Sequence, residues 1–159
     1  MATYTDSLGF NKGSAAFRAD GLTKITRMEV VLDFAAIAAA RSAAGAAALA
    51  SGDVLEVLPV PAKSLVMRVG YDVTTAEGAA ATFDLGDGSD TDGYLNDVDL
   101  NTVASGAMAL TLATGTPNTV AGYSNGKYYS AADTIDVLLN SNDVNAAKVR
   151  IWALVADAS

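Results

Sequence analysis

The 159-residue chain contains no cysteine and no histidine. Without cysteine it has no disulfide framework, no zinc-thiolate site and no thiol nucleophile. Without histidine it lacks the side chain that most often serves as acid, base or metal ligand near neutral pH. Ser-His-Asp and Cys-His catalytic arrangements are therefore excluded, and among enzymes only those based on lysine or carboxylate chemistry remain possible.

Charge is also scarce, and positive charge most of all. Charged residues make up 18% of the chain and hydrophobic residues 51%, and 10 basic residues stand against 18 acidic ones, for a net charge of −8. Such a chain is too apolar to be disordered. It also lacks the basic footprint of a nucleic-acid-binding protein. The length fits one domain, and the low surface charge favours burial of surface between subunits.

Long hydrophobic runs are missing as well. The wholly apolar run from Ala35 to Ala40 ends at Arg41. It is far shorter than the roughly 20 residues that a membrane-spanning helix needs. The N-terminus has no basic segment followed by an apolar one, so we expect neither a signal peptide nor a membrane partner.

Residues 1–27 are polar, dotted with glycine and weakly periodic, which predicts an extended N-terminal arm. The arm has a net charge of +2, so the rest of the chain carries −10. Two interpretations remain open: a solvated leader, or an arm that lies across an acidic neighbour. The charged residues of the arm are Asp6, Lys12, Arg18, Asp20, Lys24 and Arg27.

From residue 28 onward, short stretches alternate between apolar and polar residues, as half-buried strands do. In the clearest of them, Leu65, Met67, Val69, Tyr71 and Val73 are expected to share one face. About seven short strands with turns rich in Asp, Asn and Gly predict an antiparallel β-sandwich or jelly roll over residues 28–159. The alternating stretches are Met28 to Phe34, Leu65 to Val73, Ala79 to Leu85, Met108 to Leu112, Ile135 to Leu139 and Val149 to Val155.

The alanine-rich stretch from Ala35 to Gly52 predicts a short connector helix, because alanine has the highest helix propensity. This helix should break near Gly45. The next stretch, Asp53 to Val60, predicts a strand that stops at Pro59 and Pro61, because proline cannot donate to a sheet ladder.

Six carboxylates lie between Asp84 and Asp99, a density that suits a hard cation such as Ca²⁺. An EF-hand alignment fails, because its first position falls on Gly88 and its last on Asp99. A looser Ca²⁺ site using Asp87, Asp90 and Asp92 is one interpretation. The other, which we favour, is a solvated turn whose aspartates bind their own backbone, with no metal or other cofactor.

Three tyrosines, Tyr123, Tyr128 and Tyr129, flank Asn125-Gly126. This dipeptide is typical of a type I′ hairpin turn, in which the tyrosines would pair across strands. Exposed tyrosines beside Ser, Asn and Gly also suit a recognition loop, including one that stacks on sugars. Trp152 is expected in the core or at a subunit interface.

The order of these motifs resembles a known family. Residues 28–156 run from a strand ending in DFAAIAAA, through GDVLEVLPVPA, VTTAEG, TFDLGD and DTDGY, to YYSAADTIDV and the last strand VRIWALV. In this order the chain resembles the small jelly-roll virion proteins of tailed bacteriophages, which are the capsid cement or decoration proteins and their relatives on fibres.

The resemblance implies a homotrimer without enzymatic activity or cofactor. Such a trimer would sit on the outer surface of the phage capsid, at junctions between major capsid proteins, and would stabilise the head. It would be made in the cytoplasm of the bacterial host. The N-terminal arm would grip the shell, with Lys12, Arg18, Lys24 and Arg27 as candidate contacts.

Two other functions are weighed against this one. The alternative is a tail or fibre head module, or a lectin-like domain, that binds cell-surface glycans through the tyrosine loop and the acidic loop. A carboxylate-based hydrolase is the third hypothesis, and the absence of histidine, cysteine and any catalytic motif makes it the weakest.

Overall fold

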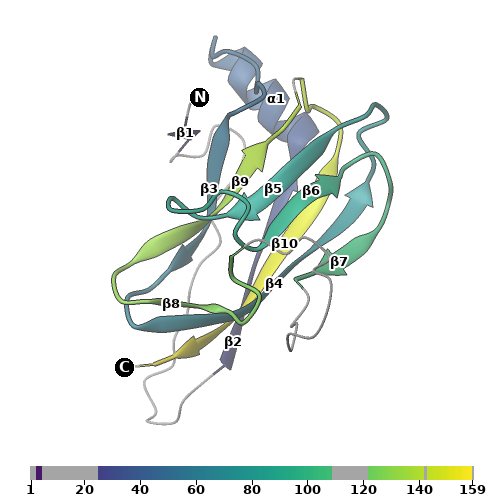
Figure 1. Cartoon of the computed structure of the whole chain (residues 1–159). Coiled ribbons are helices and arrows are strands. Elements are labelled where there is room, and N and C mark those ends of the chain that lie inside the picture. The colour runs from purple at the N-terminus through teal and green to yellow at the C-terminus, as the bar shows by residue number, and fades with distance from the viewer. Residues whose placement is uncertain (1–2, 5–24, 109–121, 142, 159) are drawn as a thin grey trace.

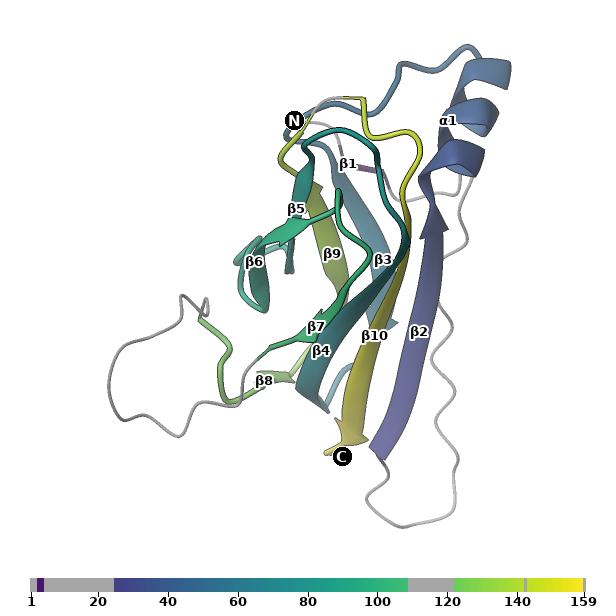
Figure 2. The same cartoon turned by 90° about the vertical axis from the view of Figure 1, so that its right-hand side faces the viewer.

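The computed structural model describes residues 3–4, 25–108, 122–141 and 143–158. In these ranges the chain forms two β-sheets packed face to face, with one helix at an end of the sandwich (Figures 1 and 2). The predicted mainly β fold with one short helix is confirmed. The elements are β1 (Thr3–Tyr4), β2 (Ile25–Asp33), α1 (Phe34–Ala43), β3 (Val54–Val60), β4 (Ser64–Thr75), β5 (Thr82–Gly86), β6 (Leu95–Asp99), β7 (Ser105–Ala107), β8 (Lys127–Tyr129), β9 (Asp133–Leu139) and β10 (Lys148–Asp157).

The strand order is that of a jelly roll. Sheet A has the order β1-β3-β9-β5-β6, and sheet B has the order β2-β10-β4-β7, with β8 also pairing on β4. Apart from the short β1 and β8, the strands taken along the chain fall in sheets B, A, B, A, A, B, A and B. The first and last of these, β2 and β10, are neighbours. This interleaving is the double-sheet arrangement of the eight-stranded jelly roll.

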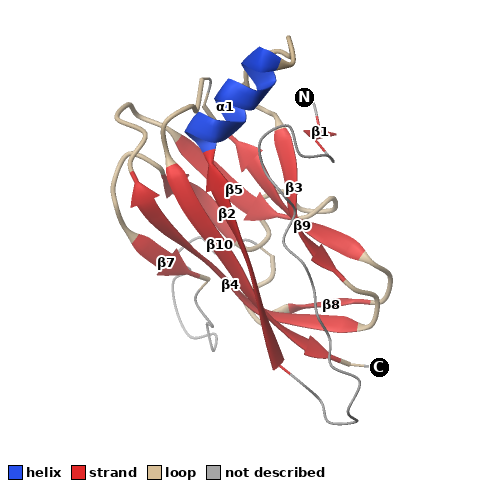
Figure 3. Ribbon diagram, turned by 180° about the vertical axis from the view of Figure 1, so that it is seen from behind, coloured by secondary structure: helices blue, strands red, loops and turns tan. Residues whose placement is uncertain are grey.

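The pairing is antiparallel throughout the described strands, with one exception. β1 pairs parallel to β3, through Thr3 with Val54 and Tyr4 with Leu55. The N-terminal end of the chain therefore lies on the edge of sheet A, whereas β2 begins on the edge of sheet B (Figure 3). The division into an arm of residues 1–27 and a domain of residues 28–159 stays a prediction, because residues 5–24 lie outside the described ranges.

The core fills the space between the sheets, as the alternation predicts. Residues that alternate along β2, β9 and β10, and from Ala81 into β5, are buried in the hydrophobic core. Burying such side chains contributes about 1.5–3 kcal/mol each to folding. The inward-facing residues are Met28, Val30, Leu32, Ala81, Phe83, Leu85, Ile135, Val137, Leu139, Val149, Ile151, Ala153 and Val155.

The prediction of which β4 side chains face the core is wrong for the first half of the strand. Val66 and Val69 are both buried, whereas Leu65 and Met67 are only half-buried. The cause is a β-bulge: Arg68 pairs with Leu154 but Val66 pairs with the next residue, Val155, so Met67 is an extra residue in β4. A bulge of this kind reverses which side of the strand faces the core.

The alanine-rich helix is confirmed, including its end. Asp33 caps α1 by accepting a hydrogen bond from the Ala36 amide at 3.1 Å. After Ala43 the chain leaves the helix, and Gly45 adopts φ +67°, a conformation that glycine takes without strain. In the described part of the chain, no helix is long and apolar enough to cross a membrane.

The strand predicted over Asp53 to Val60 is confirmed as β3, which continues through Pro59 and ends directly before Pro61. Pro59 pairs with Thr134 within β3, which ends at Val60. Among the described residues, β1 covers only the first two residues of β3, so Pro59 falls on an uncovered part of the sheet edge, where proline is tolerated. Most of the alternating stretch from Met108 to Leu112 lies outside the described residues.

Candidate functional site

The acidic stretch between Asp84 and Asp99 divides into buried and exposed carboxylates. Asp84 and Asp87 are buried, and Asp97 and Asp99 face the solvent. The Asp84 carboxylate accepts hydrogen bonds from the Asp97 amide at 2.7 Å and from Asn140 Nδ2 at 2.8 Å. Burial nonetheless raises the pKa of Asp84 above its usual value. This carboxylate therefore ties β5 to β6 and to the end of β9.

Asp87 lies at the centre of a turn and is fully buried. One of its carboxylate oxygens accepts hydrogen bonds from the amides of Ser89 and Asp90, at 2.8 and 3.1 Å. A side chain that binds the backbone two and three residues ahead is the usual way in which aspartate stabilises a turn. The favoured interpretation, a solvated turn whose aspartates bind their own backbone, is thus right about the backbone bonds of Asp87 and wrong about its solvation, because Asp87 is buried.

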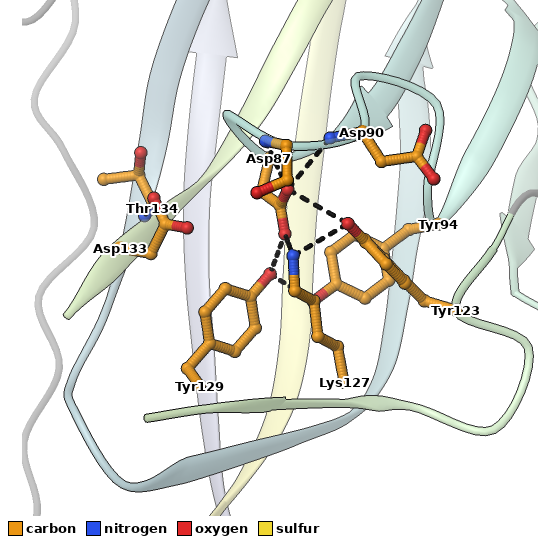
Figure 4. A network of polar contacts seen from close by, with 9 residues as sticks. Asp87, Asp90, Tyr94, Tyr123, Lys127, Tyr129, Asp133 and Thr134 are labelled. Carbon is orange, nitrogen blue, oxygen red and sulfur yellow. Dashed lines mark hydrogen bonds and ion pairs between the residues drawn. The ribbon is translucent and has the colours of Figure 1, made fainter. Parts of the chain in front are cut away.

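Three side chains from a distant part of the chain converge on the same carboxylate (Figure 4). Tyr129 and Tyr123 donate hydrogen bonds to Asp87 at 2.5 and 3.1 Å, and the Lys127 ammonium forms an ion pair with it. Lys127 also donates to the Tyr123 hydroxyl at 2.7 Å, and the hydroxyls of Tyr94 and Tyr129 lie 2.7 Å apart. We call these five residues the Asp87 network.

Two different elements position the network. Asp87 and Tyr94 flank the turn between β5 and β6 of sheet A, whereas Lys127 and Tyr129 lie on β8, which pairs with β4 of sheet B. The Tyr123 amide donates to the Gly93 carbonyl at 3.0 Å, and the Tyr123 ring packs directly against Gly93, where a Cβ would clash. The network therefore joins the two sheets.

The charges in the network balance each other. Burial disfavours the charged form of Asp87, but the hydrogen bonds from Lys127 and Tyr129 outweigh it, so the pKa of Asp87 is lowered. The same pairing outweighs desolvation at Lys127 and raises its pKa. Burial raises the pKa values of Tyr94 and Tyr129. At neutral pH the network holds one carboxylate, one ammonium and neutral tyrosines. This charge state suits a structural link between the two sheets rather than a nucleophile or a general base.

The candidate Ca²⁺ ligands are not arranged around one point. The oxygens of Asp87 already accept protein donors, as described above. Asp90 and Asp92 share a hydrogen bond that raises the pKa of Asp90. Within the ranges that the structure describes, no group of three or more acidic side chains could hold a metal ion.

The predicted type I′ turn at Asn125-Gly126 is wrong. The Gly126 amide donates to the Tyr123 carbonyl at 2.8 Å, so the turn spans Tyr123 to Gly126. Gly126 has φ +82°, but Asn125 is not among the described non-glycine residues with positive φ, as a type I′ turn would require. Of the three candidate recognition tyrosines, Tyr123 and Tyr129 face Asp87, and Tyr128 is 52% exposed.

The outer face of sheet B carries a second cluster. Trp152 on β10 lies over Gly70 of β4, where an added Cβ would come within 2.3 Å of the indole. The Arg27 guanidinium lies 5.4 Å from the centroid of the indole ring and also pairs with Glu29 at 3.2 Å. An open hollow of about 440 Å³ runs between Arg27, Asp72, Arg150, Trp152 and Leu154.

The sequence predicts this cluster only in part. Trp152, expected in the core or at a subunit interface, is partly exposed on the outer face of sheet B. The signal lies in the alternation of β10, where Arg150, Trp152 and Leu154 stand between buried residues. Arg27, a candidate shell contact, belongs to β2. The other three candidates, Lys12, Arg18 and Lys24, lie outside the described residues.

The carboxylate of Asp136 is also buried, and its hydrogen bonds do not fully offset the cost of desolvation. Its Oδ1 atom has no hydrogen-bond partner, and its pairing partner across the strands of sheet A is Glu56. Burial raises the pKa of Asp136 to about 6. Nothing in the sequence pattern indicates this, because the position has the alternation of an ordinary outward-facing residue of β9.

Comparison with known proteins finds likeness in structure but not in sequence. No family model matches the chain, and the search among curated proteins finds no relative. A chain in the capsid of Ralstonia phage GP4 superimposes with a TM-score of 0.57 at 10% identity, over 99% of both chains. A chain in the capsid asymmetric unit of cyanophage Pam1 gives 0.53 at 13% identity, over 98% of both. At these identities the likeness is one of fold.

Proposed function

We propose that the chain is a non-enzymatic structural protein of a tailed-phage virion, a homotrimer that binds the outer surface of the capsid at junctions between major capsid proteins and stabilises the head. The observation that carries this proposal is the end-to-end likeness of its fold to chains from two phage capsids. The likeness extends over nearly the full length of this chain and of each of the two capsid chains, so it is not confined to a common sheet motif.

The chemistry of the chain supports a structural role. It has no histidine and no cysteine. The most deeply buried lysine–carboxylate pair of the described residues, Lys127 with Asp87, is mutually neutralised and enclosed by tyrosines. An ion pair with several charge-assisted hydrogen bonds stabilises one arrangement of the two sheets. A rigid sandwich of this kind suits a protein that joins neighbouring capsid subunits.

The proposed mechanism is added contact area across subunit boundaries. Each subunit of a trimer would present one N-terminal arm to the shell, and three linked arms bind far more tightly than one. Lys12, Arg18 and Lys24 are the proposed shell contacts. Arg27 is assigned to the sandwich instead, because it is engaged with Glu29 and Trp152 on the outer face of sheet B.

Co-sedimentation with phage shells that lack the protein tests the proposal. Because three arms act together only on an assembled lattice, we expect tight binding to shells and little binding to isolated capsid subunits. Binding to neither would contradict the proposal. A glycan array, run with Ca²⁺ and with a chelator, examines the alternative of a glycan-binding head module; specific glycan binding without shell binding would replace the cement function by that one.

A further inference from the structure

The buried carboxylate of Asp136 faces other carboxylates from each described element that packs against it. Its side chain belongs to a residue that is only 6% exposed, and its Oδ1 atom has no hydrogen-bond partner. Glu56 of β3 lies directly opposite it in the sheet. Asp133 of its own strand β9, and Asp87 in the turn after β5, add further negative charge around it. A hydrogen bond with the Thr134 side chain acts in the other direction but does not offset burial and these charges.

Asp136 lies on the outer face of sheet A, between β3 and the turn that follows β5. Its partner on β5 is Gly86, and a Cβ added to Gly86 would clash with the backbone of Asp90 and Thr91. Directly opposed residues of neighbouring antiparallel strands point to the same face of the sheet. The backbone of the turn therefore lies over the face to which Asp136 points, and the carboxylate sits between this turn and Glu56.

The strand that carries Glu56 is also the one that the sheet holds least firmly. Among the described residues, β3 has β9 on one side, and on the other side β1 covers only its first two residues. The pairing of β3 with β9 shifts register between Glu56 and Leu58, so the ladder carries one extra residue directly beside the Asp136–Glu56 pair. Such a bulge disrupts the hydrogen bonds of the ladder locally.

We propose that the protonation of Asp136 controls local opening of the β3 edge of sheet A. When Asp136 is protonated, the buried pair carries at most one charge, and β3 stays closed against β9. When Asp136 is ionised, a buried charge without full compensation faces a second carboxylate, and such a charge is costly. Transient opening of the hydrogen bonds around the pair lets the Asp136 carboxylate reach water, so the ionised form opens far more often.

The direction of the pH dependence follows from the position of this carboxylate. Burial, with the charges of Glu56, Asp133 and Asp87, raises the pKa of Asp136 from 3.8 to about 6. In the open form the carboxyl is solvated and returns to its ordinary pKa. Opening is therefore rarest below about pH 4, increases between about pH 4 and pH 6, and levels off above that. A shift of about two pKa units corresponds to a change of about a hundredfold in the opening equilibrium.

Hydrogen exchange of the purified full chain, followed by mass spectrometry at pH 4 and pH 7.5, tests this proposal. Rates are corrected for the intrinsic pH dependence of exchange and compared between peptides that cover β3 and peptides that cover β10, an interior strand of sheet B. At pH 7.5 we expect wild-type β3 to exchange at least about tenfold faster than β10, because it opens without the rest of the sandwich. Asp136→Asn should slow exchange in β3 by at least about tenfold at pH 7.5 and by less than about threefold at pH 4.

Asp72→Asn, the same chemical change at a half-buried residue of β4 in sheet B, is the matched control and should leave exchange in β3 unchanged at both pH values. If wild-type β3 exchanges as slowly as β10 at pH 7.5, the edge opens only when the whole chain unfolds, and the proposal is overturned. It is equally overturned if Asp136→Asn leaves exchange in β3 unchanged at pH 7.5, or if Asp72→Asn slows it as much. The opening belongs to the fold of the single chain, so none of these outcomes bears on binding to phage shells.

Discussion

The ammonium of Lys127, on a strand of sheet B, lies against the carboxylate of Asp87, which directly follows a strand of sheet A. The two residues are 40 positions apart in the sequence. Asp87 is fully buried, while the Lys127 side chain keeps 20% of its exposure. Their pairing fixes how the two sheets meet at this point, and the stability of the sandwich should depend on it.

Replacing Asp87 with asparagine should lower the free energy of unfolding by about 3 kcal/mol. The change leaves Lys127 with its charge unpaired in a largely buried site, and loss of one partner of such a pair typically costs this amount. Urea denaturation of the variant and the wild type measures the difference. Asp143→Asn, the same chemical change at an exposed residue, is the control and should shift the midpoint very little. Equal midpoints for the two variants would mean that the network contributes nothing to stability.

Replacing Asp136 with asparagine should stabilise the protein at neutral pH. The pKa of Asp136 is raised from 3.8 to about 6, so the folded state binds a proton more readily than the unfolded state. Stability therefore falls as the pH rises from about 4 to 6, and the full cost, about 3 kcal/mol, is present above pH 6. We expect the variant to melt at a higher temperature than the wild type at pH 7.5 and at a similar temperature at pH 4. A difference that does not change with pH would show that the ionisation of Asp136 is not its cause.

Replacing Gly70 with alanine should displace Trp152 on the outer face of sheet B. The new Cβ would lie 2.3 Å from the Trp152 ring and 2.8 Å from the Gly106 carbonyl, so the indole has to move. Because Trp152 is the single tryptophan of the chain, its fluorescence reports the displacement directly. We expect a shifted emission maximum and a loss of about 1–3 kcal/mol of stability. Gly88→Ala is the control, since nothing lies within 4 Å of the position that its Cβ would occupy, and it should leave the emission unchanged.

Reversing the charges of the arm should separate binding to the shell from folding. In the variant with Lys12→Glu, Arg18→Glu and Lys24→Glu, we expect the melting temperature to stay close to that of the wild type. Co-sedimentation with shells should fall by at least about tenfold, and the loss should resemble the effect of raised salt on the wild type. If the variant binds shells as well as the wild type does, the proposed role of these three residues is wrong.

Periodicity alone predicts much of this fold. Strands such as Ile135 to Leu139 and Val149 to Val155 bury every second residue, and their alternation is visible in the sequence. The alanine-rich helix and its end near Gly45 follow from propensity and from the conformational freedom of glycine. The bulge at Met67 could not be predicted, because it depends on how β4 pairs with β10. The pairing register cannot be read from the sequence of one strand.

Three members of the Asp87 network are predicted from the sequence, but Tyr94, Lys127 and the arrangement of the network are not. Asp87, Tyr123 and Tyr129 stand out in two separate motifs, each with its own interpretation. Only the packing of the turn after β5 against β8 brings the two motifs into contact. Lys127 lies within the tyrosine motif, but no local signal shows that its ammonium turns inward to meet a carboxylate far away in the chain.

The most direct test of the cement function is the melting temperature of phage shells with and without the purified chain. Shells that lack the protein are mixed with it at increasing ratios, and shell disassembly is followed by calorimetry. A ligand that binds only the assembled state raises its melting temperature by mass action. We predict a rise that saturates at a fixed number of chains per shell. An unchanged shell melting temperature at saturating protein would contradict the cement function.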